Sequence, residues 1–137
     1  MRSTWVEASV AALMTSLTAC VSAPPPGCHG GEQAAVADTL YFGTREPHGV
    51  VTDEEWTGFL KDVVTPRFPR GFTVTDASGQ WLSASGAPVR ESTHILYLVH
   101  PDNEANDALL ARVITEYRTR FAQESVLRVK VKACVAF

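Results

Sequence analysis

Residues 52–66 read TDEEWTGFLKDVVTP, and this stretch determines how the rest of the chain is interpreted. Thr52 and Glu55 have the spacing of a capping box, in which the hydroxyl accepts from the third helical amide and the glutamate reaches back. Pro66 disfavours helical backbone at Thr65 and therefore ends the helix. The apolar residues between these signals recur at helical spacing and predict one buried face: Trp56, Phe59, Leu60, Val63 and Val64.

Strand-like segments lie on both sides of this helix. They are rich in β-branched and aromatic residues and are bounded by turn residues. The first precedes the helix, at residues 36–43. After the helix we expect an extended hairpin: a strand at 72–76, a turn or bulge at 76–79 leading into 80–82, a second turn at 83–88, and a long strand at 89–100.

A second helix follows Pro101, with Asp102 or Asn103 as its N-cap. Its predicted buried stripe comprises Leu110, Val113, Ile114, Tyr117 and Phe121. A last strand runs from Ser125 to the C-terminus and alternates between two kinds of side chain. The odd positions are apolar and are expected to pack, whereas the even positions include Arg128, Lys130 and Lys132 and are expected to face solvent. These cations either discourage aggregation at a sheet edge or form a basic binding stripe.

The predicted order is therefore strand, helix, strand, strand, helix, strand. Two right-handed crossovers around a hairpin give an α+β, ferredoxin-like sandwich with one four-stranded antiparallel sheet and both helices on one face. In that topology the last strand lies antiparallel beside the first, at the sheet edge. The chain has 137 residues, which is enough sequence for one domain. Its formal net charge of −3 argues against a nucleic-acid partner.

The N-terminus carries a predicted export signal. Leu17-Thr18-Ala19-Cys20 resembles the lipobox of bacterial lipoproteins, and the apolar run before it is shorter than the roughly 20 residues of a membrane span. We expect residues 1–19 to be a signal peptide, Cys20 to be acylated, residues 20–31 to be a Pro/Gly-rich tether and residues 32–137 to form the domain. The alternatives are ordinary cleavage after Ala19 and a cytosolic tail with a chance cysteine.

Export would place the domain on the periplasmic face of the cell envelope, attached to the membrane by the lipid on Cys20. Val21, where a retention signal would have Asp, favours the outer membrane. An oxidising compartment would also allow Cys28 and Cys134 to form a disulfide, and pairing of the last strand with the first would bring them together. Two separate thiols are the alternative.

Several segments together resemble a bacterial family of small secreted domains, the domain of unknown function 3574. The resemblance covers residues 39–137, and it implies a signal sequence and a cysteine before the domain matched by one in the final strand. It implies no activity. The segments that carry it are LYFG at 40–43, the helix with Trp56, Phe59 and Leu60, VTPRFPRGFTV at 64–74, Asp76 with GQW at 79–81, Arg90-Glu91, and QESVLR at 123–128.

The loop after the first helix is the best candidate for a binding site. Pro66 and Pro69 stiffen the backbone around Arg67, and Arg70 follows. Guanidinium groups suit carboxylate or phosphate ligands, so we expect a small anionic ligand there. The following hairpin would add an acceptor, an amide and an aromatic wall from Asp76, Gln80 and Trp81. Alternatively, Arg67 pairs with Asp76, Glu91 or a helix C-terminus and only fastens the loop.

The histidines and tyrosines are the remaining candidates for chemistry or binding. The four histidines, His29, His48, His94 and His100, lack metal-ligand spacing and are predicted to lie at the surface or in turns, so no metal or cofactor is expected. Tyr41 and Tyr97 are candidates for the uncovered sheet face, where a homodimer would enclose a cavity, or are ordinary interface or core aromatics.

Two classes of function remain. The first is a non-enzymatic envelope lipoprotein whose domain binds a small ligand or a partner. The second is a small cofactor-independent enzyme, an isomerase or oxygenase of the dimeric α/β-barrel type, which only fold analogy suggests. A purely structural role in the envelope is not separable from the first by sequence.

Overall fold

The computed structural model describes residues 27–137, so the predicted signal peptide, the acylated Cys20 and most of the tether lie outside the described residues. Helix α1, Asp53–Phe59, begins with the predicted capping box. The Thr52 hydroxyl accepts from the Glu55 amide at 3.2 Å, and the Glu55 carboxylate accepts from the Thr52 amide at 2.9 Å. A π-helical turn, η1 (Leu60–Val64), continues the helix up to the predicted stop before Pro66.

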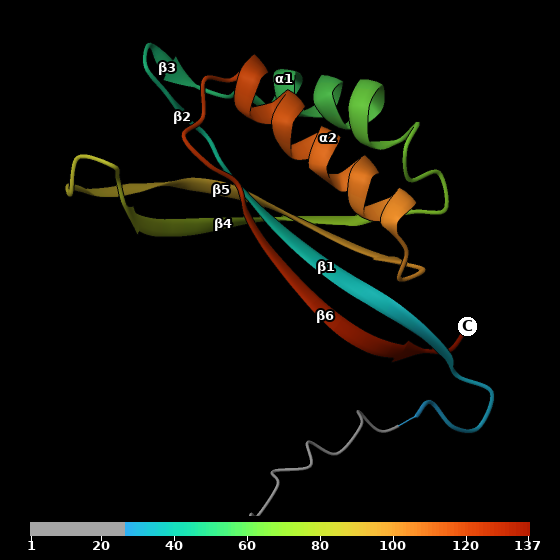
Figure 1. Ribbon diagram of the computed structural model, residues 1–137. Coiled ribbons are helices and arrows are strands. Elements are labelled where there is room, and N and C mark those ends of the chain that lie inside the picture. Colours follow the sequence, from blue (N-terminus) through green and yellow to red (C-terminus); the bar gives the residue numbers. More distant parts are fainter. Residues whose placement is uncertain (1–26) are drawn as a thin grey trace, which may run out of the picture.

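Four long strands form the main sheet: β1 (Gln33–Gly43), β4 (Thr73–Leu82), β5 (Pro88–His100) and β6 (Leu127–Val135). Their order is β4-β5-β1-β6, and every neighbouring pair is antiparallel. Helix α2, Glu104–Arg120, lies with α1 on one face of this twisted sheet (Figure 1). The protein is therefore an α+β fold whose last strand lies beside its first.

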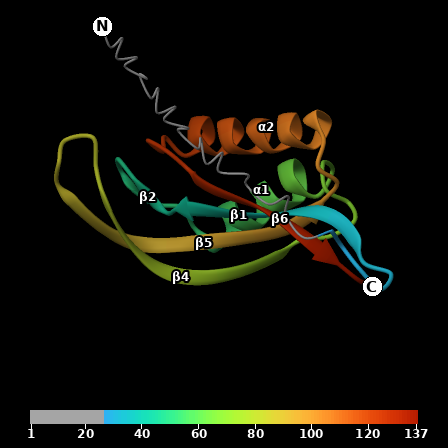
Figure 2. The same ribbon diagram turned by 60° about the horizontal axis from the view of Figure 1, so that its bottom comes forward.

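The β4–β5 hairpin extends past the end of α2 (Figure 2). A second, short hairpin pairs β2 (Arg45–Glu46) with β3 (Gly49–Val50) and was not predicted, because two-residue strands show no alternating pattern. It is fixed to the sheet through Thr44, whose hydroxyl donates to the Ser92 carbonyl oxygen at 2.9 Å.

The core lies between the helices and the sheet, and the predicted stripes of both helices contribute to it. Phe42 of β1 packs against Trp56 of α1 and Tyr117 of α2, with ring centroids 5.3 and 4.6 Å apart. The Tyr117 hydroxyl donates to the Gly43 carbonyl oxygen at 2.9 Å, so a buried phenol is satisfied at the end of β1. Asn103 caps α2 by accepting from the Asn106 amide, which selects one of the two predicted caps.

The turn or bulge predicted at residues 76–79 was wrong, because β4 is continuous there. Asp76, Ala77, Ser78 and Gly79 pair in register with β5, whose length supplies backbone partners that override the local turn preference. Gly79 has a packing role instead: a Cβ built at this position would lie 2.9 Å from the Thr93 hydroxyl oxygen.

The predicted orientation of the last strand was also wrong. The apolar odd positions of β6 point away from the helices, and Leu127 and Val131 are 59% and 54% exposed. The even positions lie on the helix side, where Arg128 is partly buried against Asp38. Alternation identifies two faces of a strand but does not say which one the helices cover.

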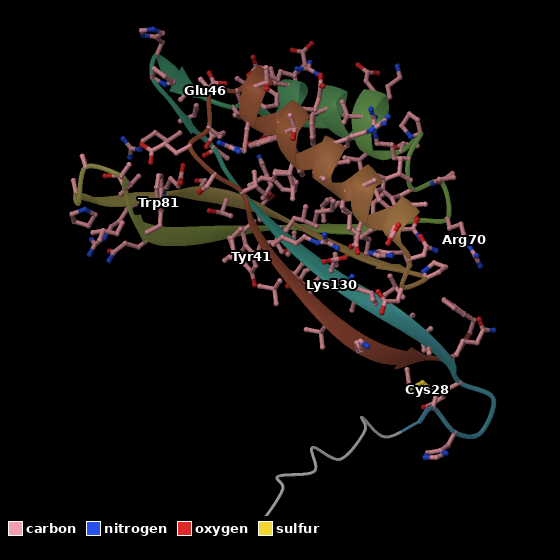
Figure 3. All side chains as sticks on the ribbon, viewed as in Figure 1. Cys28, Tyr41, Glu46, Arg70, Trp81 and Lys130 are labelled. Atoms are coloured by element: carbon pink, nitrogen blue, oxygen red, sulfur yellow. A yellow bond between two sulfur atoms is a disulfide. The ribbon has the colours of Figure 1, made fainter. Side chains whose placement is uncertain are left out.

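Cys28 and Cys134 form the expected disulfide, with their Cα atoms 5.4 Å apart. It joins the segment before β1 to the end of β6, where the two strands pair through Ala34 and Cys134 (Figure 3). None of the helices within residues 27–137 is long and apolar enough to cross a membrane.

Candidate functional site

The two arginines of the predicted binding loop lie between η1 and β4. Arg67 donates from Nη1 to the Val63 carbonyl oxygen at 2.6 Å, so it fastens the C-terminal end of the helical segment, one of the alternatives that sequence left open. Arg70 is exposed, and Gly71 follows it with a φ of 122°, a backbone conformation that favours glycine. The positive φ turns the chain from the loop into β4.

The other three predicted site residues lie along the hairpin and bind to β5. Asp76 Oδ1 is 2.6 Å from His94 Nδ1, Gln80 accepts from Arg90 Nε at 2.6 Å, and Trp81 Nε1 donates to Glu91 at 2.6 Å. Figure 3 shows Trp81 near the hairpin tip and Arg70 at the opposite end of the molecule. The structure therefore brings Arg67 and Arg70 together and places Asp76, Gln80 and Trp81 elsewhere.

Arg67 and Arg70 line a cleft of about 860 Å³. Its other walls are the N-terminal part of β1, the end of β5 and the chain terminus at Phe137. β4 begins only at Thr73, which pairs with Tyr97, so the last residues of β5 extend past it and the arginine loop borders them instead. This offset between the two strands creates the cleft.

The cleft combines apolar and cationic surfaces. Tyr97 and Val99 of β5 contribute side chains from the sheet face that points away from the helices, and Phe68 and Phe72 contribute rings from the loop. Within residues 27–137, neither Arg67 nor Arg70 forms a salt bridge with a carboxylate. An exposed guanidinium beside apolar walls suits an anion that carries an apolar body.

A buried ion cluster, missed by sequence reasoning, lies on the helix side of the same strands. Asp38 of β1 has a fully buried side chain and accepts two hydrogen bonds from Arg128, at 2.6 and 2.7 Å. His100 Nε2 lies 2.7 Å from Asp38 Oδ2, one of the two oxygens that accept from Arg128. Burial alone would raise the pKa of Asp38, but the hydrogen bonds from Arg128 and His100 outweigh it, so the pKa is lowered and the carboxylate is ionised.

The cluster continues to the first turn of α2. Arg128 also donates to Asp107 at 2.6 Å, and Lys130 lies 2.9 Å from Asp107 and 3.1 Å from Asp102. The hydrogen bonds from Lys130 and Arg128 lower the pKa of Asp107 to about 2. These contacts explain why the cationic face of β6 turns towards the helices.

The prediction that His94 and His100 are surface or turn residues was wrong, since they are 7% and 5% exposed. Both share the core face of β5 with Leu96 and Leu98, and this two-residue period was the signal for burial. Their carboxylate partners come from β4 and β1, which spacing within β5 cannot reveal. His94 also stacks on Trp56, with centroids 4.5 Å apart, and among the described residues its Nε2 has no hydrogen-bond partner.

Hydrogen bonding limits what His100 can do chemically. Its Nδ1 is 2.8 Å from the Pro101 carbonyl oxygen, and its Nε2 faces the ionised Asp38. Both ring nitrogens thus lie within hydrogen-bonding distance of protein oxygens, and neither is left without a partner to face a ligand. The cluster therefore forms part of the wall of the cleft, through Asp38 and His100. Arg70 is the exposed charged residue of the cleft lining.

A second, smaller hollow of about 410 Å³ is lined by Arg45 of β2 and by residues of the β4–β5 hairpin, among them Gln80 and Arg90. Arg45 donates to the Arg90 carbonyl oxygen at 2.8 Å, and Arg90 donates to Gln80. Both guanidinium groups are thus partly used within the hairpin, which makes this hollow the weaker of the two candidates.

Solved structures with a similar fold include a phage SAM lyase and CutA. A phage SAM lyase in complex with S-methyl-5'-thioadenosine has a TM-score of 0.57 at 15% identity, covering 84% of this chain and 97% of that chain. CutA from Synechococcus elongatus PCC7942 complexed with Bis-Tris has a TM-score of 0.52 at 14% identity, covering 77% of this chain and 87% of that chain. At such identities the similarity shows the fold alone.

No curated protein matches the sequence significantly. The model of one protein family does match, over residues 37–137, which is nearly the whole described domain and agrees with the resemblance carried by the TPRFP and GQW segments. The chain therefore belongs to the family described as protein of unknown function DUF3574.

Proposed function

We propose that this protein is a non-enzymatic domain that binds a small organic anion in the cleft between the arginine loop and the ends of β1 and β5. The carboxylate or phosphate of the ligand pairs with Arg70, and its apolar part lies against Phe72, Tyr97 and Val99. The observation that carries the proposal is the cleft itself, which combines about 860 Å³ with an exposed arginine that has no carboxylate partner among the described residues.

Calorimetric titration of the full-length chain in detergent tests this. Phenylphosphate and hexanoate serve as probes with an apolar body, and inorganic phosphate serves as a probe without one. We expect the apolar probes to bind more tightly than inorganic phosphate, because burial of apolar surface adds about 25 cal/mol per Å².

Two variants locate the binding. Arg70→Ala should weaken phenylphosphate binding at least about tenfold, since a charge-assisted hydrogen bond contributes roughly 1.5–3 kcal/mol. Arg112→Ala removes an exposed arginine from α2 and is the matched control. No binding of any probe, or equal affinities of Arg70→Ala and the native chain, would contradict the proposal.

We further propose that the domain is exported and held on the periplasmic face of the envelope, in the outer membrane, by acylation of Cys20. The lipobox sequence and a disulfide that suits an oxidising compartment support this. Labelling with a fatty-acid analogue should mark the native chain and not Cys20→Ala, and the labelled chain should fractionate with outer membranes. Label that persists in Cys20→Ala would contradict acylation at this residue.

The architecture is, in our proposal, ferredoxin-like. Supporting it are the antiparallel order β4-β5-β1-β6 and the two helices on one face. The same fold class hosts enzymes, and an isomerase or oxygenase is the alternative function. It is less well supported because both nitrogens of His100, the imidazole that lines the cleft, already face protein oxygens at hydrogen-bonding distance.

A further inference from the structure

The sheet face that points away from the helices, hereafter the open face, has a composition suited to burial. Three rows of side chains cross its strands in register, with Thr39 between Tyr97 and Val129 in the middle row and Ala37 between Val99 and Val131 beside it. The third row has Tyr41 in its centre, and Figure 3 shows Tyr41 on this side of the sheet. None of the three rows contains a charged side chain.

The distribution of polarity on β6 is the reverse of that expected for a solvated sheet face. Its cations, Arg128 and Lys130, point towards the helices and are used in the ion cluster. Its apolar side chains point outward, with Val129 and Val131 40% and 54% exposed. An antiparallel sheet with one wet face normally has polar residues there, and charge depletion with apolar enrichment is typical of the centre of a protein interface.

The open face has the size that a stable interface needs. Four strands about 4.8 Å apart and about nine residues long, at roughly 3.3 Å per residue, give on the order of 500 Å² in projection. Protruding side chains have more accessible surface than their projection, so the face approaches the ~800 Å² that each partner contributes to a standard interface. It also matches the largest apolar patches found on monomers, which often mark interaction sites.

We propose that a second copy of this chain packs on the open face. The three uncharged rows have nothing that would select an oppositely charged partner, whereas they are complementary to themselves when a symmetry axis places equivalent rows against one another. Tyr97 and Val99 belong both to this face and to the wall of the cleft. The second copy therefore closes the outer side of the cleft, so that each ligand site lies at a boundary between protomers.

Sedimentation velocity of the full-length chain in density-matched detergent, without ligand, tests the proposal. The native chain should sediment as a dimer or a higher oligomer. Val129→Asp and Val131→Asp should raise the dissociation constant at least about tenfold, because each would bury a charge without a partner in the interface. Val50→Asp changes a valine on β3 that is 62% exposed and lies away from the open face, and it should leave the oligomer intact.

A charge in a strand could also prevent folding, so Val131→Thr provides a second variant of similar shape and strand preference. It should keep the native circular dichroism spectrum and still weaken association. A monomeric native chain at ~100 μM, or oligomers unchanged in both Val129→Asp and Val131→Thr, would overturn the proposal and assign the face to another occupant. If the monomer still binds phenylphosphate, the proposed binding function survives that result.

Discussion

Arg128 on β6 holds the carboxylate of Asp38 on β1 through two hydrogen bonds, of 2.6 and 2.7 Å, although the Asp38 side chain has no exposed surface. The pair links the edge strand to the central strand from the helix side, and the bridge to Asp107 extends it to α2. A bidentate pair of this kind fixes orientation as well as distance. It determines which face of β6 the helices cover and which face remains open.

Asp38→Asn should destabilise the fold strongly. The substitution keeps the shape of the side chain but removes the negative charge that faces Arg128 and His100, so that Arg128 keeps only Asp107. Breaking one partner of a buried pair costs about 3–5 kcal/mol. Urea unfolding followed by circular dichroism measures this. Asp62→Asn removes an exposed carboxylate from η1 and should cost less than about 0.5 kcal/mol. Equal losses in the two variants would contradict the structural role of the cluster.

Acid should unfold the protein partly through the same cluster. The folded-state pKa values of Asp38 and Asp107 lie below the value of about 3.9 that an unfolded aspartate has. Their stabilising contribution is therefore complete above about pH 4 and is lost as the pH falls towards 2. The free energy of unfolding of Asp107→Asn should decline less steeply between these pH values than that of the native chain, and parallel declines would contradict the assignment.

Loss of the disulfide should destabilise the chain without changing its fold. The bond joins residues 106 positions apart, and closing so long a loop lowers the entropy of the unfolded state, an effect of up to roughly 4.7 kcal/mol in the chain-entropy model. The double variant Cys28→Ala/Cys134→Ala should lose about 2–5 kcal/mol in urea and keep its circular dichroism spectrum. The native chain treated with a reducing agent is the parallel measurement, and unchanged stability in both would show that the bond contributes nothing.

Gly43→Ala should disturb the hydrogen bonds of Glu91, which link the β4–β5 hairpin to β2. A Cβ at Gly43 would lie 2.5 Å from Glu91 Oε1, the atom that accepts from Trp81, while Oε2 accepts from the Arg45 amide. Glu91 would have to release at least one of these donors, so we expect a loss of about 1–3 kcal/mol. Gly49→Ala, at a glycine with open space around it, is the control and should be nearly neutral. A shift in Trp81 fluorescence that appears only in Gly43→Ala would identify the cause.

The sequence predicted most elements because their signals are local. The capping box at Thr52, the stop at Pro66 and the helical stripe through Tyr117 each depend on neighbours within a turn or two, and the structure contains them. Turn preference at residues 76–79 was also local, yet it was overridden by the ten residue pairs that β4 forms with β5. The same holds for the candidate site. The stiffened loop that brings Arg67 and Arg70 together is a local feature, whereas the separation of this loop from Trp81 depends on how the strands pair and was not predicted.

The amino-acid sequence by itself determined the order of the long strands and the helices, the alternation of β6 and the pairing of the two cysteines. Periodicity and capping depend on residues that are close together in the chain. Only the tertiary structure decided which face of β6 turns outward, which carboxylates meet His94 and His100, and where a cleft opens. Those outcomes depend on contacts between residues far apart in the chain, such as Asp38 with Arg128. Whether a buried charge is stable depends on the partners that it meets in the folded state, and no local pattern of residues specifies these partners.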